Sequence, residues 1–230
     1  MADTHVQQVK NDDVVLKAKN FYTQYQKPLL TAVIVVVVLI AGWYGYKNYI
    51  VAPKEEEAEN AMWKAEQYFR QDSLKLALDG DKFSRGFNYV INNYGSTKAG
   101  SLAKYYAGVS YLRLGNFNKA VDNLKDFSTS AKQIQMMAYG ALADAYSELN
   151  KNDDAVNYYK KAANEFTDDA TMSSEYLFRA ALKLETLGKN SEALDLYKEL
   201  KQKYPNTERG FAADKYIYRL SIIPNDFSAK

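Results

Sequence analysis

The sequence predicts an all-α protein in which a single N-terminal transmembrane helix is followed by an α-solenoid of about four helix pairs and a closing helix. Residues 29–46 form an uncharged and strongly apolar run. After it, one pattern of small, aromatic and turn-forming residues recurs, with Tyr111 and Tyr146 lying 35 positions apart. The chain has only 4 prolines among its 230 residues, which suits long helices joined by short turns.

The run from Leu29 to Tyr46 is the predicted membrane span. As a helix its 18 residues would be about 27 Å long, close to the thickness of the hydrocarbon layer. Ten of them are Leu, Ile or Val, and together they favour insertion by about 3–6 kcal/mol. A buried β-strand of this length would be unusual. A cleaved signal peptide would place its apolar core nearer the start of the chain. We therefore predict an uncleaved transmembrane helix over residues 29–50, which binds the lipid bilayer from Leu29 to Tyr46.

The polar tail, residues 1–28, fits two interpretations. Asp13 could cap a short amphipathic helix that runs toward Phe21 along the membrane surface, or the tail could be a disordered lead-in. Four lysines precede the span within twenty residues and three follow it. Because flanks richer in Lys and Arg stay cytoplasmic, we expect a cytoplasmic tail and a translocated domain. This predicts a single-pass protein of the inner (cytoplasmic) membrane with a periplasmic repeat domain.

Composition argues against several classes of function. The net charge of +2 gives no reason to expect nucleic acid as a partner. Cysteine is absent, which excludes disulfides, thiolate metal sites and a cysteine nucleophile. No catalytic motif occurs, and the one histidine, His5, lies in the tail. Carboxylate pairs such as Asp153–Asp154 stand at expected helix starts, where they cap amide groups. We therefore expect no enzyme, no cofactor and no metal site.

Residues 54–94 are predicted to form a degenerate first helix pair. Pro53 followed by three glutamates indicates a helix start, because proline and carboxylates suit a first turn. An apolar face runs from Ala58 to Phe69. The Asp79-Gly80-Asp81 segment is interpreted as a turn. A second helix would then carry Phe83, Phe87, Val90, Ile91 and Tyr94.

Three repeat units follow, and each part of their pattern has a physical reason. Small residues are expected where the two helices of a pair cross closely. They are Gly108 with Ala120, Ala143 with Ala155, and Ala181 with Ala193. Large aromatic residues would fill gaps between successive pairs. They are Tyr111, Phe127, Tyr146, Tyr159 and Tyr197. Gly115, Asn150 and Gly188 would end each first helix in a left-handed conformation.

This outline resembles the tetratricopeptide repeat (TPR) family. The resemblance covers residues 96–222, predicted to hold the TPR-like repeats and a C-terminal capping helix over 207–221; residues 223–230 are predicted to be a flexible end. The capping helix is expected because the junction at 94–100 is echoed at 204–210. The tryptophan near each repeat start is missing, as is the repeat-end proline except Pro205.

The resemblance implies a scaffold for protein–protein interaction, because stacked pairs form a groove that binds extended peptides or partner helices. By register, the residues expected to face the groove are Tyr105, Val109, Leu112, Arg113, Asp144, Ser147, Glu148, Phe178, Arg179, Leu182 and Glu185. Val109, Leu112 and Leu182 also fit simple packing. Aromatic residues and arginines dominate interface energetics, which favours Tyr105, Arg113, Phe178 and Arg179.

The order of tail, span and repeats resembles the single-pass, periplasm-facing ancillary subunit of the bacterial Sec translocon. That likeness implies the translocon, a membrane-bound foldase, periplasmic chaperones or exported chains as partners. The lysine and asparagines with which some repeat domains clamp the C-terminal carboxylate of a chaperone are absent at Tyr105 and Val109. The alternative is an N-anchored receptor whose repeats face the cytosol and serve protein targeting.

Overall fold

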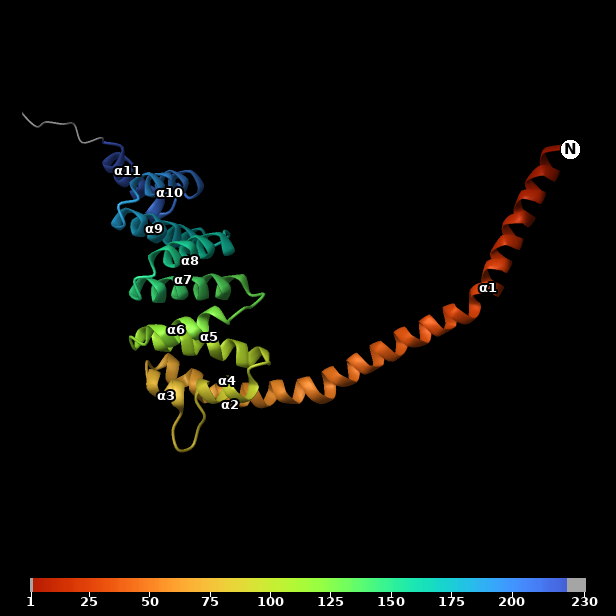
Figure 1. Cartoon of the computed structure of the whole chain (residues 1–230), viewed down its shortest axis with the longest axis horizontal. Coiled ribbons are helices and arrows are strands. Elements are labelled where there is room, and N and C mark those ends of the chain that lie inside the picture. Colours follow the sequence, from red (N-terminus) through yellow and green to blue (C-terminus); the bar gives the residue numbers. More distant parts are fainter. Residues whose placement is uncertain (1, 223–230) are drawn as a thin grey trace, which may run out of the picture. The chain divides into compact units, whose positions relative to one another are not determined.

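The computed structural model describes residues 2–222, so the predicted flexible end at 223–230 lies outside the described residues (Figure 1). Between residues 2 and 222 the regular elements are helices, and the only β-type pairing is an isolated bridge between Gly80 and Arg85. The all-α class is confirmed. The chain divides into two compact units, one ending at Pro53 and one beginning at Lys54.

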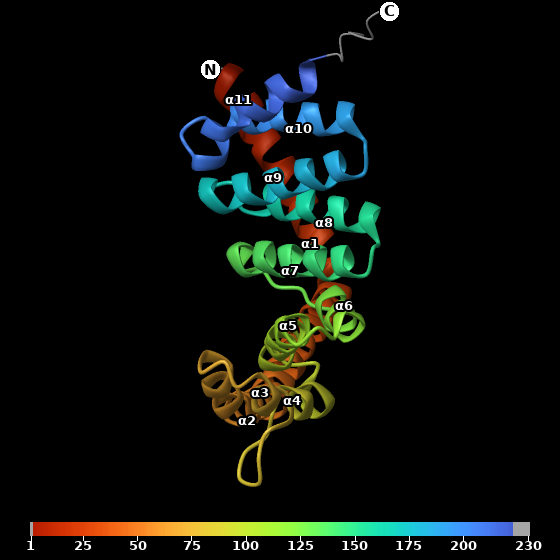
Figure 2. The ribbon, with the colours of Figure 1, turned by 90° about the vertical axis from the view of Figure 1, so that its left-hand side faces the viewer.

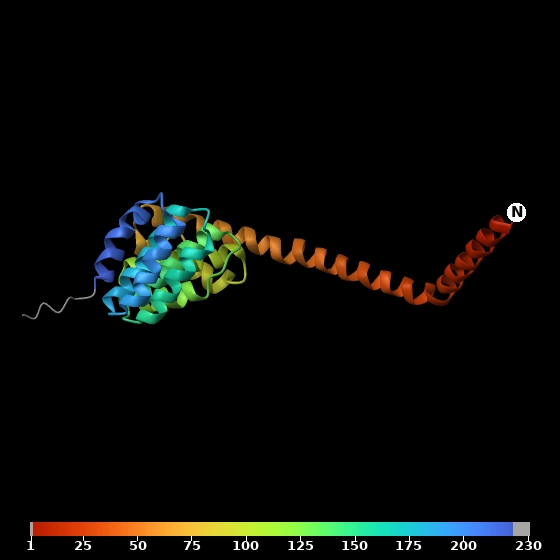
Figure 3. The same ribbon diagram turned by 90° about the horizontal axis from the view of Figure 1, so that it is seen from above.

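The first unit is built on α1 (Ala2–Tyr46), which is followed by one π-helical turn, η1 (Lys47–Val51). The stretch from Asp13 toward Phe21 is helical, as the first interpretation of the tail expected, but α1 begins at Ala2, so the helix does not start at Asp13. The disordered lead-in is not what the structure shows. Pro28 also lies inside α1. Proline cannot donate to the carbonyl one turn earlier and its ring crowds that carbonyl, which accounts for the bend in α1 seen in Figures 1 and 3.

The apolar run of α1 packs against nothing in the described chain. None of its most apolar 18-residue window is buried, and the mean hydropathy of that window is 2.2. By length and composition it is a helix that could cross a membrane or act as a signal sequence. Because the window is not buried, its side chains are not part of a core formed by the described residues.

The second unit is a stack of helices, as predicted. Its elements are α2 (Ala52–Arg70), α3 (Leu74–Asp79), α4 (Phe87–Tyr94), α5 (Lys98–Arg113), α6 (Phe117–Lys125), α7 (Lys132–Glu148), α8 (Asn152–Glu165), α9 (Ala170–Thr186), α10 (Asn190–Lys203) and α11 (Glu208–Ser221). Figures 1 and 2 show them layered in chain order, with α2, α3 and α4 at one end and α11 at the other. Three regular pairs, an irregular first layer and a closing helix match the predicted solenoid.

The first layer differs from the prediction in two ways. Helical backbone already includes Ala52, so Pro53 lies within the first turn of α2 and does not begin a new helix after a break. The expected second helix begins only at Phe87, as α4, and Phe83 lies in the loop before it, 96% exposed; the short α3, ahead of the predicted turn at 79–81, was not expected. Asp81 causes the break, because its carboxylate accepts the backbone N–H groups of Phe83 and Ser84 at 2.8 and 2.7 Å.

The regular pairs are joined as the sequence indicates. Gly115, Asn150 and Gly188 have φ angles of +76°, +57° and +73°, so each ends its helix in the left-handed region. Gly108 is buried against the side chain of Leu124, and a methyl group there would overlap that leucine. The four alanines at the two later crossings, Ala143, Ala155, Ala181 and Ala193, are completely buried.

The repeated junction has a structural cause. Thr97 and Thr207 are the N-caps of α5 and α11, and their hydroxyl groups accept the N–H groups of Gly100 and Gly210 at 2.9 and 3.1 Å. Each hydroxyl also donates to the carbonyl of the tyrosine three residues earlier. Both glycines lie against that same carbonyl, where a Cβ would collide with it. The echo at 94–100 and 204–210 is therefore one capping motif used twice, and the predicted closing helix is confirmed.

Candidate partner-binding surface

Most residues predicted to face a groove line two adjoining hollows on α5 to α9. The first hollow, of about 440 Å³, is lined by Leu112, Arg113, Gly115, Phe117, Asp144, Ser147, Glu148 and Tyr159. The second, of about 290 Å³, is lined by Ser147, Tyr159, Arg179, Leu182, Lys183 and Thr186. Ser147 and Tyr159 belong to both. We call these two hollows together the α5–α9 surface.

Four of the predicted groove residues lie outside both hollows. Phe178 is only 6% exposed and packs against Tyr197 and Tyr216 at ring-centroid distances of 5.9 and 5.1 Å. It is a core residue, because position 178 turns inward while Arg179, one residue later, turns outward. Tyr105 packs on Phe127 at 5.5 Å.

Val109 and Glu185 complete this group. Val109 is half-buried beside the core formed by α2 to α7. Glu185 is held by Arg219 of α11 at 2.5 Å and accepts the hydroxyl group of Tyr197 at 3.1 Å. Both side chains therefore support the fold.

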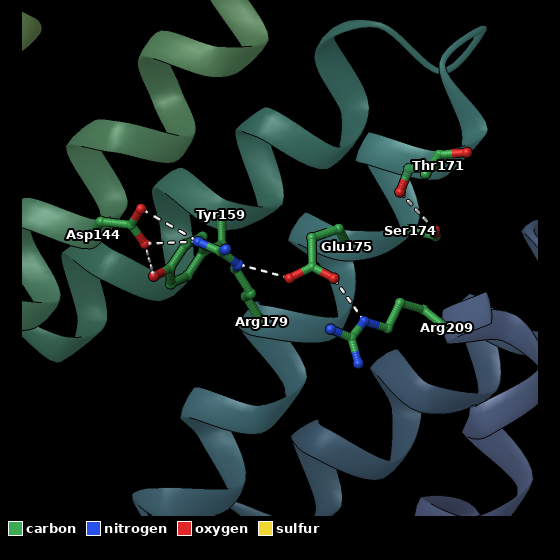
Figure 4. Close-up of polar contacts among 7 residues, drawn as sticks. All are labelled: Asp144, Tyr159, Thr171, Ser174, Glu175, Arg179 and Arg209. Atoms are coloured by element: carbon green, nitrogen blue, oxygen red, sulfur yellow. Dashed lines mark hydrogen bonds and ion pairs between the residues drawn. The ribbon is translucent and has the colours of Figure 1, made fainter. Parts of the chain in front are cut away.

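Asp144, Tyr159 and Arg179 line the hollows, and we call these three residues the floor. They belong to a chain of polar contacts that continues to Glu175 and Arg209 (Figure 4). Arg179 on α9 donates to Asp144 on α7 at 3.0 Å and to Glu175 at 2.9 Å. Arg209 on α11 donates to the other oxygen of Glu175 at 2.6 Å. Tyr159 on α8 donates its hydroxyl hydrogen to Asp144. This Asp144–Arg179–Glu175–Arg209 ladder connects three successive first helices, α7, α9 and α11.

The pKa values of Glu175 and Tyr159 are shifted in directions that preserve these hydrogen bonds. Burial alone would raise the pKa of Glu175, but the hydrogen bonds from Arg179 and Arg209 outweigh burial and hold that pKa below its usual value. Burial, together with the hydrogen bond to Asp144, raises the pKa of Tyr159 above the ordinary value of a tyrosine. At neutral pH the floor is therefore a set of paired charges with a protonated tyrosine, which gives it a fixed hydrogen-bond pattern.

Sequence reasoning missed Glu175, Arg209 and Tyr159, although a signal for the first two exists. In four of the cross-helix ion pairs the partners lie 34 to 36 residues apart, which is one repeat length. Opposite charges at that offset meet because equivalent helices of neighbouring repeats stack side by side.

On the α5–α9 surface, two charged side chains have no ion-pair partner within the described chain and a third is weakly paired. Among the described residues, the side chains of Glu148 and Lys183 have no ion-pair partner, and Glu148 is exposed. Arg113 pairs with Asp72 at 2.7 Å, but both side chains are largely exposed, and such a pair is weak and easily exchanged. The surface therefore offers one carboxylate, two cations and the apolar side chains of Leu112 and Leu182 to a ligand.

No group of three or more His, Cys, Asp or Glu side chains suited to a metal ion occurs among the residues that the structure describes. The carboxylates of Asp144 and Glu175 are paired with arginines in the ladder. The arrangement suits binding through shape and a few polar contacts.

Comparison with known families gives two matches. A model described as "Tetratricopeptide repeat-like domain" matches residues 19–171, and one described as "Tetratricopeptide repeat" matches residues 175–207. The first match covers well over half of the chain and begins ahead of Leu29, so it includes the apolar run. No curated protein matches the chain.

Proposed function

Because the chain belongs to the tetratricopeptide repeat-like family, we propose that it is a membrane-anchored scaffold whose repeats bind protein partners. The observation that carries the proposal is the α5–α9 surface, where two adjoining hollows share Ser147 and Tyr159. Repeat solenoids bind extended segments along such surfaces. The ligand would be an extended segment or helix of another protein.

Rigidity of the floor supports this assignment. Asp144 and Arg179 line the hollows and are also members of the ladder, so their positions are fixed before a ligand arrives. Preorganised contacts reduce the ordering cost of binding. Glu148 and Lys183, which are not used in the ladder, would provide the polar contacts that set ligand orientation, while Leu112 and Leu182 bury apolar surface.

For the anchor, we propose the helix from Leu29 to Tyr46. Its support is that these apolar side chains are exposed, as lipid-facing residues are. The lysine distribution favours a cytoplasmic tail and a periplasmic repeat domain at the inner membrane. The layout then supports partners in the cell envelope: the Sec translocon, a membrane-bound foldase, chaperones or exported chains.

Protease treatment of sealed cells tests the topology. Opening the outer membrane alone should allow protease to degrade the repeat domain and leave the tail protected. Protection of the repeats until the inner membrane is broken would contradict this, and would favour the targeting receptor with cytosol-facing repeats.

A purification of the full chain from detergent, with its anchor intact, tests the surface. Glu148→Lys together with Lys183→Glu should lower the recovery of partner proteins several-fold, since both accessible charges change sign. Asn118→Lys, at an exposed position of α6 outside both hollows, is the matched control and should leave recovery unchanged. Equal loss with the control, or no loss with the double variant, would contradict the assignment.

A further inference from the structure

The closing helix α11 carries an apolar stripe on the side that faces away from the stack. Phe211 and Tyr218 are each 72% exposed and Ile222 is 52% exposed. Phe211 and Tyr218, seven positions apart, lie on one face of α11, and Ile222, the C-cap residue of that helix, follows four positions later. The opposite face is already used, because Ala213 is completely buried and Tyr216 and Leu220 pack on the core. The stripe is therefore a second apolar face on a helix that has already made its core contacts.

Such a stripe is unusual at this place in a solenoid. The outer face of a terminal repeat is normally polar, because no further repeat covers it. Figure 2 shows α11 as the last layer of the stack. Three large apolar side chains in line on that layer indicate an interaction surface rather than scattered exposure.

The charges beside the stripe are neutralised within the same chain. Asp214 is paired with Lys201 of α10, and Arg219 is paired with Glu185 of α9. Lys215 lies inside the stripe, between Phe211 and Tyr218, and its Nζ is 6.0 Å from the ring centroid of Tyr216 in the same chain. An occupant of the stripe must therefore supply apolar contacts at both ends and accommodate a cation near the centre.

We propose that the occupant is the α11 helix of a second copy of this chain, packed antiparallel across a two-fold axis. With the axis placed midway between Tyr216 and Ile217, Phe211 of each copy faces Ile222 of the other. Lys215 of each copy then faces the ring of Tyr218 of the other, and a cation over an aromatic ring is a favourable contact. Each copy thus supplies the other with apolar side chains at both ends of the stripe and with an aromatic ring opposite Lys215. An isologous interface requires such self-complementarity.

The paired charges on either side of the stripe also favour a second copy of the chain as the occupant. Two identical surfaces bring like charges together, and a row of unpaired charges would oppose the association. Here Asp214 and Arg219 are compensated by Lys201 and Glu185 of the same chain. Only Lys215 is duplicated near the axis, and each copy of it has a tyrosine ring opposite.

Absence of native cysteine allows a direct test on the full chain in its membrane. Lys215→Cys places one thiol close to the two-fold axis, and a short bifunctional thiol reagent should join two copies. Asn118→Cys, exposed on α6, is the control and should give no dimer. Failure of Lys215→Cys to form a dimer, equal dimer formation by the control, or a crosslink only to another protein would overturn the proposal.

A second variant separates this interface from other routes to a dimer. Tyr218→Glu should weaken self-association of the full chain in detergent about tenfold or more, while Tyr218→Phe should retain it, and both should keep the native helix content. Gly45→Leu, in the span, should leave the Lys215→Cys crosslink intact. A dimer that survives Tyr218→Glu but is lost with Gly45→Leu would overturn the proposal, because association would then reside in the span.

Discussion

Arg179 of α9 donates to the carboxylate of Asp144 of α7 at 3.0 Å, joining equivalent helices of successive repeats. The same guanidinium also binds Glu175, four residues earlier on its own helix. Arg179 thus connects a contact within one repeat to a contact between repeats. Asp144 and Arg179 line the α5–α9 surface, so the group that stabilises the stack also fixes the floor on which a ligand would lie.

Removing this connection should loosen the stack modestly. Asp144 and Arg179 have side chains that are 35% and 41% exposed, and solvent screening limits such pairs to about 0.5–1 kcal/mol. We expect Arg179→Ala to lower the free energy of unfolding by about that amount in urea titration. A double-mutant cycle with Asp144→Ala should show coupling, whereas Arg70→Ala, which removes only the exposed pair with Glu66, should have a smaller effect. Additive losses at 144 and 179 would contradict a direct interaction.

A methyl group at Gly108 should carry a steric cost that offsets its gain in helix propensity. A Cβ at this position would overlap the side chain of Leu124, and overpacking costs about 1–3 kcal/mol. Alanine favours helix over glycine by about 1 kcal/mol, so Gly108→Ala should be neutral to destabilising by about 2 kcal/mol in urea titration. Adding Leu124→Ala should cost less in the Gly108→Ala background than in the native one. Equal cost in both backgrounds would show that the two side chains do not meet.

The N-cap of α5 should depend on a hydroxyl group. Thr97 accepts the N–H of Gly100 at 2.9 Å, and loss of such a cap costs about 0.5–2 kcal/mol. Thr97→Ala should therefore lower the thermal midpoint of the repeat domain, while Thr97→Ser should retain most of the stability. A serine variant as unstable as the alanine variant would indicate that the methyl group of Thr97 matters more than its hydroxyl.

Acid should weaken the ladder through Glu175. The pKa of Glu175 is lower in the folded chain than its usual value, because the bonds from Arg179 and Arg209 outweigh burial. A carboxyl group with a depressed folded pKa adds stability above its unfolded pKa and loses that stability as the pH falls through the folded value. The stability difference between the native chain and Glu175→Gln should therefore be greatest near neutral pH and shrink below the usual titration range of glutamate, about pH 4.3. A difference that is constant with pH would contradict a charged role.

Much of the fold is readable from the sequence because its signals are local. Gly115, Asn150 and Gly188 mark left-handed helix ends, and the threonine-to-glycine spacing at 97–100 and 207–210 marks helix starts. The error at Phe83 has a different origin. Its spacing from Phe87 fits a helical face, but the pattern does not show that the Asp81 carboxylate would capture the two following N–H groups.

The surface was predicted only in part, because it depends on contacts one repeat apart. The pattern places Asp144, Glu148 and Arg179 correctly on helices that border the hollows. It does not distinguish Phe178, which is buried, from its neighbour Arg179, which is accessible, since the boundary between core and surface depends on how α9 is rotated against α10 and α11. The ladder could not be predicted from the pattern either, because it depends on how the helices of successive repeats are aligned with one another.

Site-specific photo-crosslinking in intact cells tests the central claim most directly. A photoreactive side chain replaces Glu148, on the α5–α9 surface, in one strain and Asn118, on α6, in a matched strain. The account predicts that position 148 yields a discrete crosslinked product containing another envelope protein and that position 118 does not. Identical products at both positions, or crosslinks from position 148 only to cytoplasmic proteins, would contradict it.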